Sequence, residues 1–125
     1  MLKLTKSEAR EVLYIETELC DGGDLFDKLI ATDGKGLPED EARRIFHQLV
    51  SAMKNVHAAG ITHVDIKLDN MLISGSNIKL CDFAFAAETV SQIRGVGTPG
   101  YMAPELFDKL SKIKDLTPLD IFSSG

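Results

Sequence analysis

Apolar residues recur with a helical period through the second quarter of the chain. They fall at positions 42, 45, 46, 49, 50, 53 and 56, the spacing of one buried helix face. Pro38 suits a first helical turn, and the acidic run Glu39-Asp40-Glu41 suits the positive end of a helix dipole. Gly60 is a natural stop. The pattern therefore predicts an amphipathic helix between Pro38 and Gly60.

Shorter elements are predicted on both sides of this helix. Residues 12–19 are rich in β-branched and aromatic residues and are typical of a strand, whereas residues 24–30 favour a short amphipathic helix with Asp24 near its start. Residues 71–73 and 78–80 are short apolar strands joined by Ser74-Gly75-Ser76-Asn77, which indicates a hairpin. The predicted fold class is therefore α+β. The stretch from Asp82 to Met102 holds Gly95, Gly97, Pro99 and Gly100 and is long and irregular, which is typical of a functional or mobile segment.

Polar residues flank the predicted hairpin. Asn70 precedes its first strand and Asp82 follows its second, so the return of the chain brings the two close together. An Asp and an Asn oxygen, with room for water or phosphate, are ligands that Mg²⁺ accepts. Asp65 is then available as a base, and Lys67 could neutralise a phosphate. These residue types suffice for phosphoryl transfer, in which positioning and charge neutralisation contribute most of the catalysis.

Five motifs resemble those of eukaryotic protein kinases, in the same order and with similar spacing. His63 to Asn70 resembles the catalytic loop H-R-D-x-K-x-x-N, and Asp82-Phe83-Ala84 stands where D-F-G belongs. Residues 97–105 are similar to the segment that ends in A-P-E, and residues 120–125 to D-x-W-S-x-G. Residues 17–26 are similar to the hinge and the helix after it. The motifs cover nearly the whole chain, so it is identified as a member of this family.

The resemblance implies a role for each matching residue. Asp65 would be the catalytic base, Lys67 would contact the transferring γ-phosphate, and Asn70 and Asp82 would hold Mg²⁺. The nucleotide would be ATP, bound through the gatekeeper Thr17, the backbones of Glu18 and Cys20, the ribose contact Asp24, the floor residue Leu72 and the neighbouring Cys81. Lys67 and Thr98 together resemble the serine/threonine type, which implies a protein substrate with a Ser or Thr hydroxyl. His63 and His57 are expected to be structural.

Phe122 replaces the tryptophan of D-x-W-S-x-G and preserves its bulk, and three further departures from the family pattern bear on function. Val64 replaces the arginine that pairs with a phosphorylated activation loop, so this switch is expected to be absent. Ala84 replaces the D-F-G glycine and would cost about 1 kcal/mol if that position needs a positive φ. The 125 residues contain no G-x-G-x-x-G loop and no V-A-I-K lysine. Residues 1–125 are therefore expected to form a partial kinase domain that lacks the N-lobe loop and lysine and the C-terminal helices, and the isolated chain is expected to be inactive.

Composition narrows the partners and the location. The formal net charge is −5 with no basic stripe, which argues against nucleic acid and anionic membranes as partners. No apolar stretch is long enough for a membrane segment and no secretory signal is visible at the N-terminus. The two cysteines, 61 residues apart, are typical of reduced thiols. We therefore expect an intracellular, cytoplasmic protein.

Three functions fit these observations. The first is a serine/threonine kinase represented by part of its catalytic domain. The second is a truncated, non-catalytic kinase-fold module that binds nucleotide or a partner protein. The third, a Mg²⁺-dependent hydrolase built on Asp65, Asn70 and Asp82, is disfavoured because it leaves the hinge-like and A-P-E-like segments unexplained.

Overall fold

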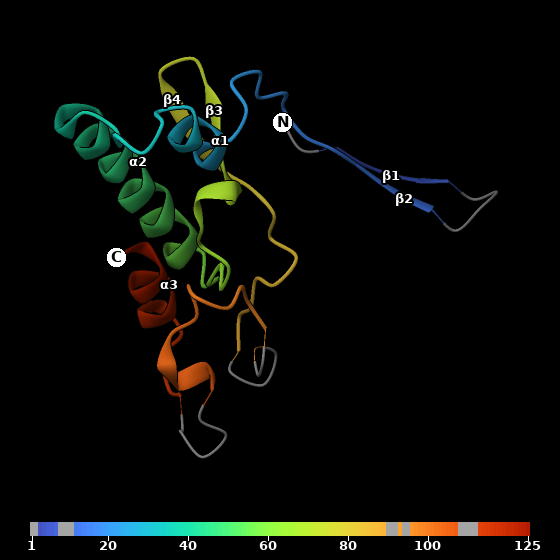
Figure 1. The fold of residues 1–125 in the computed structure, drawn as a ribbon. Coiled ribbons are helices and arrows are strands. Elements are labelled where there is room, and N and C mark those ends of the chain that lie inside the picture. Colours follow the sequence, from blue (N-terminus) through green and yellow to red (C-terminus); the bar gives the residue numbers. More distant parts are fainter. Residues whose placement is uncertain (1–2, 8–11, 90–92, 94–95, 108–112) are drawn as a thin grey trace.

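The computed structural model describes residues 3–7, 12–89, 93, 96–107 and 113–125. Two strands, β1 (Lys3–Ser7) and β2 (Val12–Glu16), pair antiparallel, with Lys3 opposite Glu16. Figure 1 shows this hairpin extending away from the helices. The remaining elements follow as α1 (Leu25–Ile30), α2 (Glu39–Ala58), β3 (Met71–Ser74), β4 (Asn77–Leu80) and α3 (Thr117–Ser124). The described residues thus contain both α and β structure, which confirms the predicted mixture of helices and strands.

Helix α2 has the buried face that its sequence predicts. Ile45, Leu49 and Met53 are its buried residues, and Gly60 takes a φ of 76° directly after the helix. These side chains pack with apolar residues of α1, the catalytic-loop region and β3. We call this set the α2 core: Leu25, Ile45, Leu49, Met53, Ile66 and Met71.

Strands β3 and β4 form the predicted hairpin beside α2, with Met71 opposite Leu80 and Ser74 opposite Asn77. Figure 1 shows the pair next to α1 and α2. The segment after β2 is tied to β3, because Gly22 N donates to the Ile73 carbonyl at 3.0 Å and Ile73 N donates to the Gly23 carbonyl at 2.8 Å. A Cβ on Gly22 would lie 2.8 Å from the Ile73 carbonyl oxygen, so only glycine allows this approach.

A second group of apolar residues surrounds α3. We call this set the α3 core: Val64, Ala87, Ile93, Ala103, Leu106, Leu116 and Leu119. Residues 62–66 are all buried and contribute Val64 to the α3 core and Ile66 to the α2 core. The segment that carries the candidate catalytic aspartate is therefore clamped between two apolar clusters.

Two predicted elements need correction. The predicted strand 12–19 ends at Glu16, since Glu18 and Leu19 continue without a partner strand in the described structure. Residues 61–70, which show no period in the sequence, include a short 3-10 helix at Leu68–Asn70. Across the described residues, no helix combines the length and the apolar character needed to cross a membrane.

Candidate functional site

The backbone of the candidate catalytic loop is held by Asp120. This carboxylate, fully buried on α3, accepts hydrogen bonds from His63 N at 2.9 Å and from Val64 N at 2.8 Å. It also accepts from His57 Nε2 at 2.7 Å. A buried carboxylate without partners would be costly, and these three donors satisfy it. Asp120 therefore fixes the approach to Asp65 from a residue far along the chain, and His57 is structural.

Val64 occupies an unusual backbone conformation. Its φ is 70°, a region that β-branched residues rarely adopt, and its side chain is buried in the α3 core. The bond from Val64 N to Asp120 holds it there, and Gly97 leaves room for it, because a Cβ added at Gly97 would lie 3.2 Å from the Val64 carbonyl oxygen. At the position where the family pattern has an arginine, this chain thus carries an apolar side chain that packs in the α3 core.

Asp65 is the centre of a hydrogen-bonded cluster. Its Oδ1 accepts from Thr98 N at 2.9 Å and from Thr98 Oγ1 at 2.6 Å. Its Oδ2 accepts from Asn70 Nδ2 at 3.1 Å and lies 3.2 Å from Lys67 Nζ. Lys67 Nζ in turn donates to Thr98 Oγ1 at 2.9 Å. The structure therefore brings together three of the predicted residues, Asp65, Lys67 and Asn70, and adds Thr98.

The surroundings of Asp65 favour its charged form. Burial by itself would raise the pKa of this carboxyl group, but the hydrogen bonds from Thr98, Lys67 and Asn70 and the Lys67 charge outweigh burial and lower the pKa. The lowered pKa keeps the Asp65 carboxylate ionised at neutral pH. Because Asp65 is only 2% exposed, this carboxylate has little access to bulk water.

The backbone of Cys81, the residue before Asp82, is hydrogen-bonded to the loop that carries the Asp65 cluster. Cys81 N donates to the Asn70 carbonyl at 3.0 Å, and His63 Nε2 donates to the Cys81 carbonyl at 2.9 Å. The rings of His63 and Phe83 meet edge to face with centroids 4.7 Å apart. The Asp82-Phe83 pair is thus attached to the catalytic loop from both sides, and His63 has the structural role expected for it.

The backbone strain at the D-F-A motif falls on Asp82. Asp82 has a φ of 58°, and its Oδ1 accepts from Ala84 N at 3.2 Å. Among the described non-glycine residues, positive φ angles occur at Asp33, Val64 and Asp82. Ala84 is not in this group, so the cost considered for an alanine at this position does not arise in this conformation.

Asn70 and Asp82 provide donors of the kind that Mg²⁺ uses. The Asn70 amide nitrogen donates to Asp65, which leaves the amide oxygen as the free end of the side chain. Asp82 is exposed. One carboxylate and one amide oxygen with room for water fit a hard cation. Within the described ranges, no group of three or more His, Cys, Asp or Glu side chains gathers as a ready-made metal centre.

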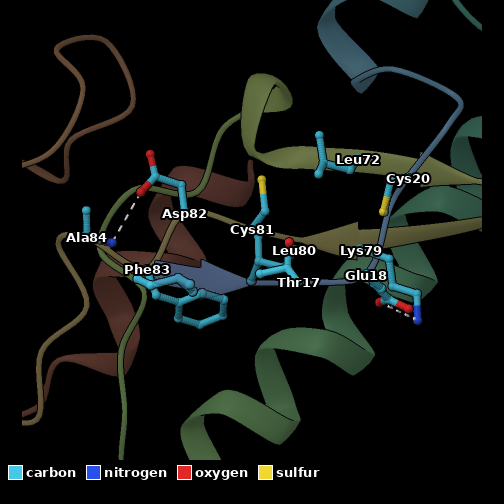
Figure 2. Close-up of a pocket in the computed structure, with 11 residues that line it drawn as sticks. Thr17, Glu18, Cys20, Leu72, Lys79, Leu80, Cys81, Asp82, Phe83 and Ala84 are labelled. Atoms are coloured by element: carbon cyan, nitrogen blue, oxygen red, sulfur yellow. Dashed lines mark hydrogen bonds and ion pairs between the residues drawn. The ribbon is translucent and has the colours of Figure 1, made fainter. Parts of the chain in front are cut away.

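A pocket of about 730 Å³ lies between the segment after β2 and the β3–β4 hairpin. Figure 2 shows its walls: Thr17, Glu18 and Cys20 on one side, with Leu72, Cys81 and Asp82 on the hairpin side. No main-chain hydrogen bond joins Glu18 or Cys20, both of which line the pocket, to another described residue. The pocket thus contains five of the six residues predicted to bind nucleotide.

The sixth residue, Asp24, has a different position. Asp24 does not line the pocket; its Oδ1 accepts from Asp27 N at 2.8 Å and caps α1. It remains beside the pocket wall through an isolated bridge to Leu72. Burial and the negative charge of Asp82 raise the pKa of the Cys81 thiol, which disfavours its thiolate form.

The sequence analysis did not assign site roles to Thr98 and Asp120. Both stand in quoted motifs, but their roles depend on contacts across the fold: Thr98 bonds to Asp65, 33 residues away, and Asp120 bonds to His63, 57 residues away. Periodicity and spacing carry no sign of such contacts. The indication available in the sequence was a polar residue, Asp120, within the apolar run of residues 116–122.

Comparison with known proteins identifies similar sequences. The protein kinase domain family matches residues 3–125. CBL-interacting protein kinase 4 of Oryza sativa subsp. japonica is 39% identical over 123 residues, which cover 93% of this chain and 27% of the relative. Testis-specific serine/threonine-protein kinase 3 of Mus musculus is 36% identical over 118 residues, which cover 90% of this chain and 42% of the relative.

A human kinase is also similar in sequence to this chain. Hormonally up-regulated neu tumor-associated kinase of Homo sapiens is 38% identical over 127 residues, which cover 94% of this chain and 17% of that protein. The chain therefore spans between 17% and 42% of the length of these three relatives.

Proposed function

The chain belongs to the protein kinase domain family, and on this premise we propose that it carries the hinge and catalytic loop of a serine/threonine kinase that transfers phosphate from ATP to protein hydroxyls. The observation that carries the proposal is the Asp65–Lys67–Thr98 cluster. It combines an ionised, buried carboxylate with a cation and a hydroxyl, all joined by hydrogen bonds of 3.2 Å or less.

In this mechanism Asp65 acts as the base. Its carboxylate would orient the Ser or Thr hydroxyl of the substrate and accept its proton as the bond to phosphorus forms. Thr98 and Asn70 hold the carboxylate in place before substrate arrives, so little reorganisation is needed at the moment of transfer.

Lys67 supplies positive charge beside the base. Its ammonium lies 3.2 Å from Asp65 and would neutralise charge on the transferring phosphoryl group. Asn70 and Asp82 would hold Mg²⁺, which when bound neutralises charge on the nucleotide phosphates.

The pocket between Thr17 and Leu72 would bind the adenine of ATP. Its size and its apolar wall suit a flat ring, and the backbone groups of Glu18 and Cys20 supply polar contacts at one edge. Asp24 would reach the ribose with the carboxylate oxygen that does not cap α1.

A second candidate is a kinase-fold module that binds nucleotide or a partner protein without transferring phosphate. The first candidate explains better why Asp65, Lys67 and Asn70 form one satisfied cluster, since a module that only binds has no need of a positioned base.

A transfer assay separates the two candidates. The chain is tested alone and joined to the remaining kinase segments of the rice relative, with labelled ATP and a set of Ser, Thr and Tyr peptides. We expect transfer to Ser and Thr by the joined protein, and a loss of about 10²–10⁴-fold in Asp65→Asn, which keeps the shape but cannot accept the proton. A joined protein that binds Mg-ATP tightly but transfers nothing supports the second candidate.

A further inference from the structure

A second groove, of about 570 Å³, lies between α2 and the β3–β4 hairpin. It is separate from the proposed nucleotide pocket in all lining residues but Lys79, which contributes to both. Its polar lining comes from five residues of α2 and two of β4: Arg44, His47, Gln48, Ser51, Asn55, Asn77 and Lys79. None of the proposed catalytic residues takes part in it.

The ionisable residues that line this groove are all basic: Arg44, His47 and Lys79. This sets the groove apart in a chain whose net charge is −5. Two of them have acidic neighbours outside the groove, since Arg44 lies 4.0 Å from Glu41 and Lys79 Nζ lies 3.1 Å from Glu18. Exposed pairs of this kind contribute at most about 1 kcal/mol, so an incoming carboxylate can compete for these cations.

The groove is preformed by Gln48. Its Oε1 accepts from Ile78 N at 2.8 Å, and its Nε2 donates to the Ser76 carbonyl at 3.2 Å. Arg44 donates to the same carbonyl. These bonds fix the hairpin turn against α2, and they occupy the outer edge of β4 at Ile78. A ligand would therefore bind through side-chain contacts in the groove rather than by adding a strand at that point.

We propose that this groove is a docking site for an extended acidic segment of a partner protein. Carboxylates of the segment would meet Arg44 and His47, and its small apolar side chains would contact Ala52 and Ile78 in the groove floor. Ser51 and Asn77 offer hydrogen bonds to a peptide backbone.

A nucleic acid fits the groove less well. No Phe, Tyr or Trp lines it, so His47 is the one ring on which a base could stack, and the net charge of −5 would repel a long polyanion. A short segment with a few carboxylates places its charge on the basic patch alone.

Fluorescence polarisation tests the proposal with the 125-residue chain. The probe is a fluorescein-labelled pool of short peptides with glutamate fixed at alternate positions. We expect saturable binding that weakens as salt rises from about 0.05 to 0.5 M, because screening weakens contacts between exposed charges. The double variant Arg44→Glu, His47→Glu should weaken binding at least about tenfold.

Three controls make the result specific. Arg43→Glu has the same charge change one residue from Arg44, at a position outside the groove, and should alter binding less than about twofold. His47→Glu alone guards against unfolding caused by loss of the Arg44 bond to the hairpin turn, and should still weaken binding. The same pool with lysine in place of glutamate should not bind.

The following outcomes would overturn the proposal: no saturable binding of the glutamate pool, equal binding of the lysine pool, or equal losses in the Arg43 and His47 variants. Tighter binding of a single-stranded oligonucleotide at the same residues would also overturn it, in favour of a polyanion site.

Discussion

The candidate catalytic loop, residues 63–70, and the segment after β2 both contact the β3–β4 hairpin or its ends, but they are held in very different ways. In the catalytic loop, His63 and Ile66 are fully buried and Asp65 is 2% exposed. In the segment after β2, Leu19 is 88% exposed, and Thr17 and Glu18 are exposed as well. The first region is thus an interior structure, whereas the second is a surface strip.

The difference lies in the number and kind of tethers. In the candidate catalytic loop, His63 N and Val64 N donate to the buried carboxylate of Asp120 on α3. The buried carboxylate of Asp65, within the loop, accepts from Thr98 N. The segment after β2 is tethered by the backbone bonds of Gly22 and Gly23 with Ile73 and by the exposed Glu18–Lys79 pair. Contacts within this chain therefore fix the groups proposed to carry out the chemistry more firmly than those proposed to bind adenine.

The largest effect is expected from breaking the first region. Asp120→Ala removes the acceptor for His63 N and Val64 N, and each buried donor left unpaired costs about 1–3 kcal/mol. We expect a loss of about 3 kcal/mol or more in the free energy of unfolding, measured by urea denaturation. The exposed Asp69→Ala is the matched control and should change this quantity by less than about 0.5 kcal/mol. Equal losses would mean that Asp120 does not anchor the loop.

The second region, the segment after β2, is tested at Gly22, where a backbone hydrogen bond ties it to β3. Gly22→Ala would place a Cβ 2.6 Å from Ile73 Cγ2 and 2.8 Å from its carbonyl oxygen, so the bonds to β3 must shift. Overpacking of this kind costs about 1–3 kcal/mol. At Gly23, with a φ of 71°, a Cβ meets no atom within 4 Å, so Gly23→Ala carries only the backbone cost of about 1 kcal/mol. Hydrogen exchange of Ile73 N should rise more in the first variant; the reverse order would contradict the steric argument.

Acid should weaken the catalytic loop through Asp65. Its pKa is lower in the folded protein than in the unfolded chain, so the stability it contributes is present above the unfolded pKa of about 4 and is lost as pH falls through the folded pKa. Thr98→Val removes one donor, brings the two pKa values closer and should cost about 1 kcal/mol at neutral pH. The difference between wild type and variant should shrink at low pH. A constant difference across the acid range would show that Thr98 acts only by packing.

The last prediction concerns the affinity of the exposed segment after β2 for nucleotide, which is expected to be weak. The proposed hinge contacts are present, but these 125 residues include no glycine-rich loop to cover the phosphates. We expect isothermal titration calorimetry of the isolated chain to give a Kd for Mg-ATP in the millimolar range, about −4 kcal/mol. Low-micromolar binding would show that the exposed segment binds nucleotide as firmly as a buried site.

The sequence predicted the local elements well and the long-range contacts poorly. Helix α2 and the β3–β4 hairpin follow from period, caps and turn residues, and both are confirmed. The strand predicted over residues 12–19 was too long because Thr17 and Leu19 suit a strand by residue type, whereas among the described residues β2 pairs with β1 as far as Glu16.

The contacts of the candidate site also divide into local ones, which the sequence predicted, and long-range ones, which it did not. Asn70 and Asp65 are near in sequence, and their contact could be anticipated from the loop. The convergence of Asn70 and Asp82 follows from the hairpin, and the backbone bond between Asn70 and Cys81 supports it. The positions of Thr98 and Asp120 depend on how the chain folds back after residue 82, which no local pattern encodes. The nucleotide and metal roles stay predictions.

The bond between Asp120 and the catalytic loop also has a consequence for the order of folding. It joins residues 57 apart in the chain, whereas α2 and the β3–β4 hairpin close through neighbouring residues. Long-range contacts form late because chain closure must come first. During synthesis, the helix and hairpin can form as soon as they leave the ribosome, but the loop lacks its anchor until Asp120 follows. The segment that carries Asp65 is therefore expected to be the last part of this fold to become ordered, and the first to be exposed to chaperones and proteases.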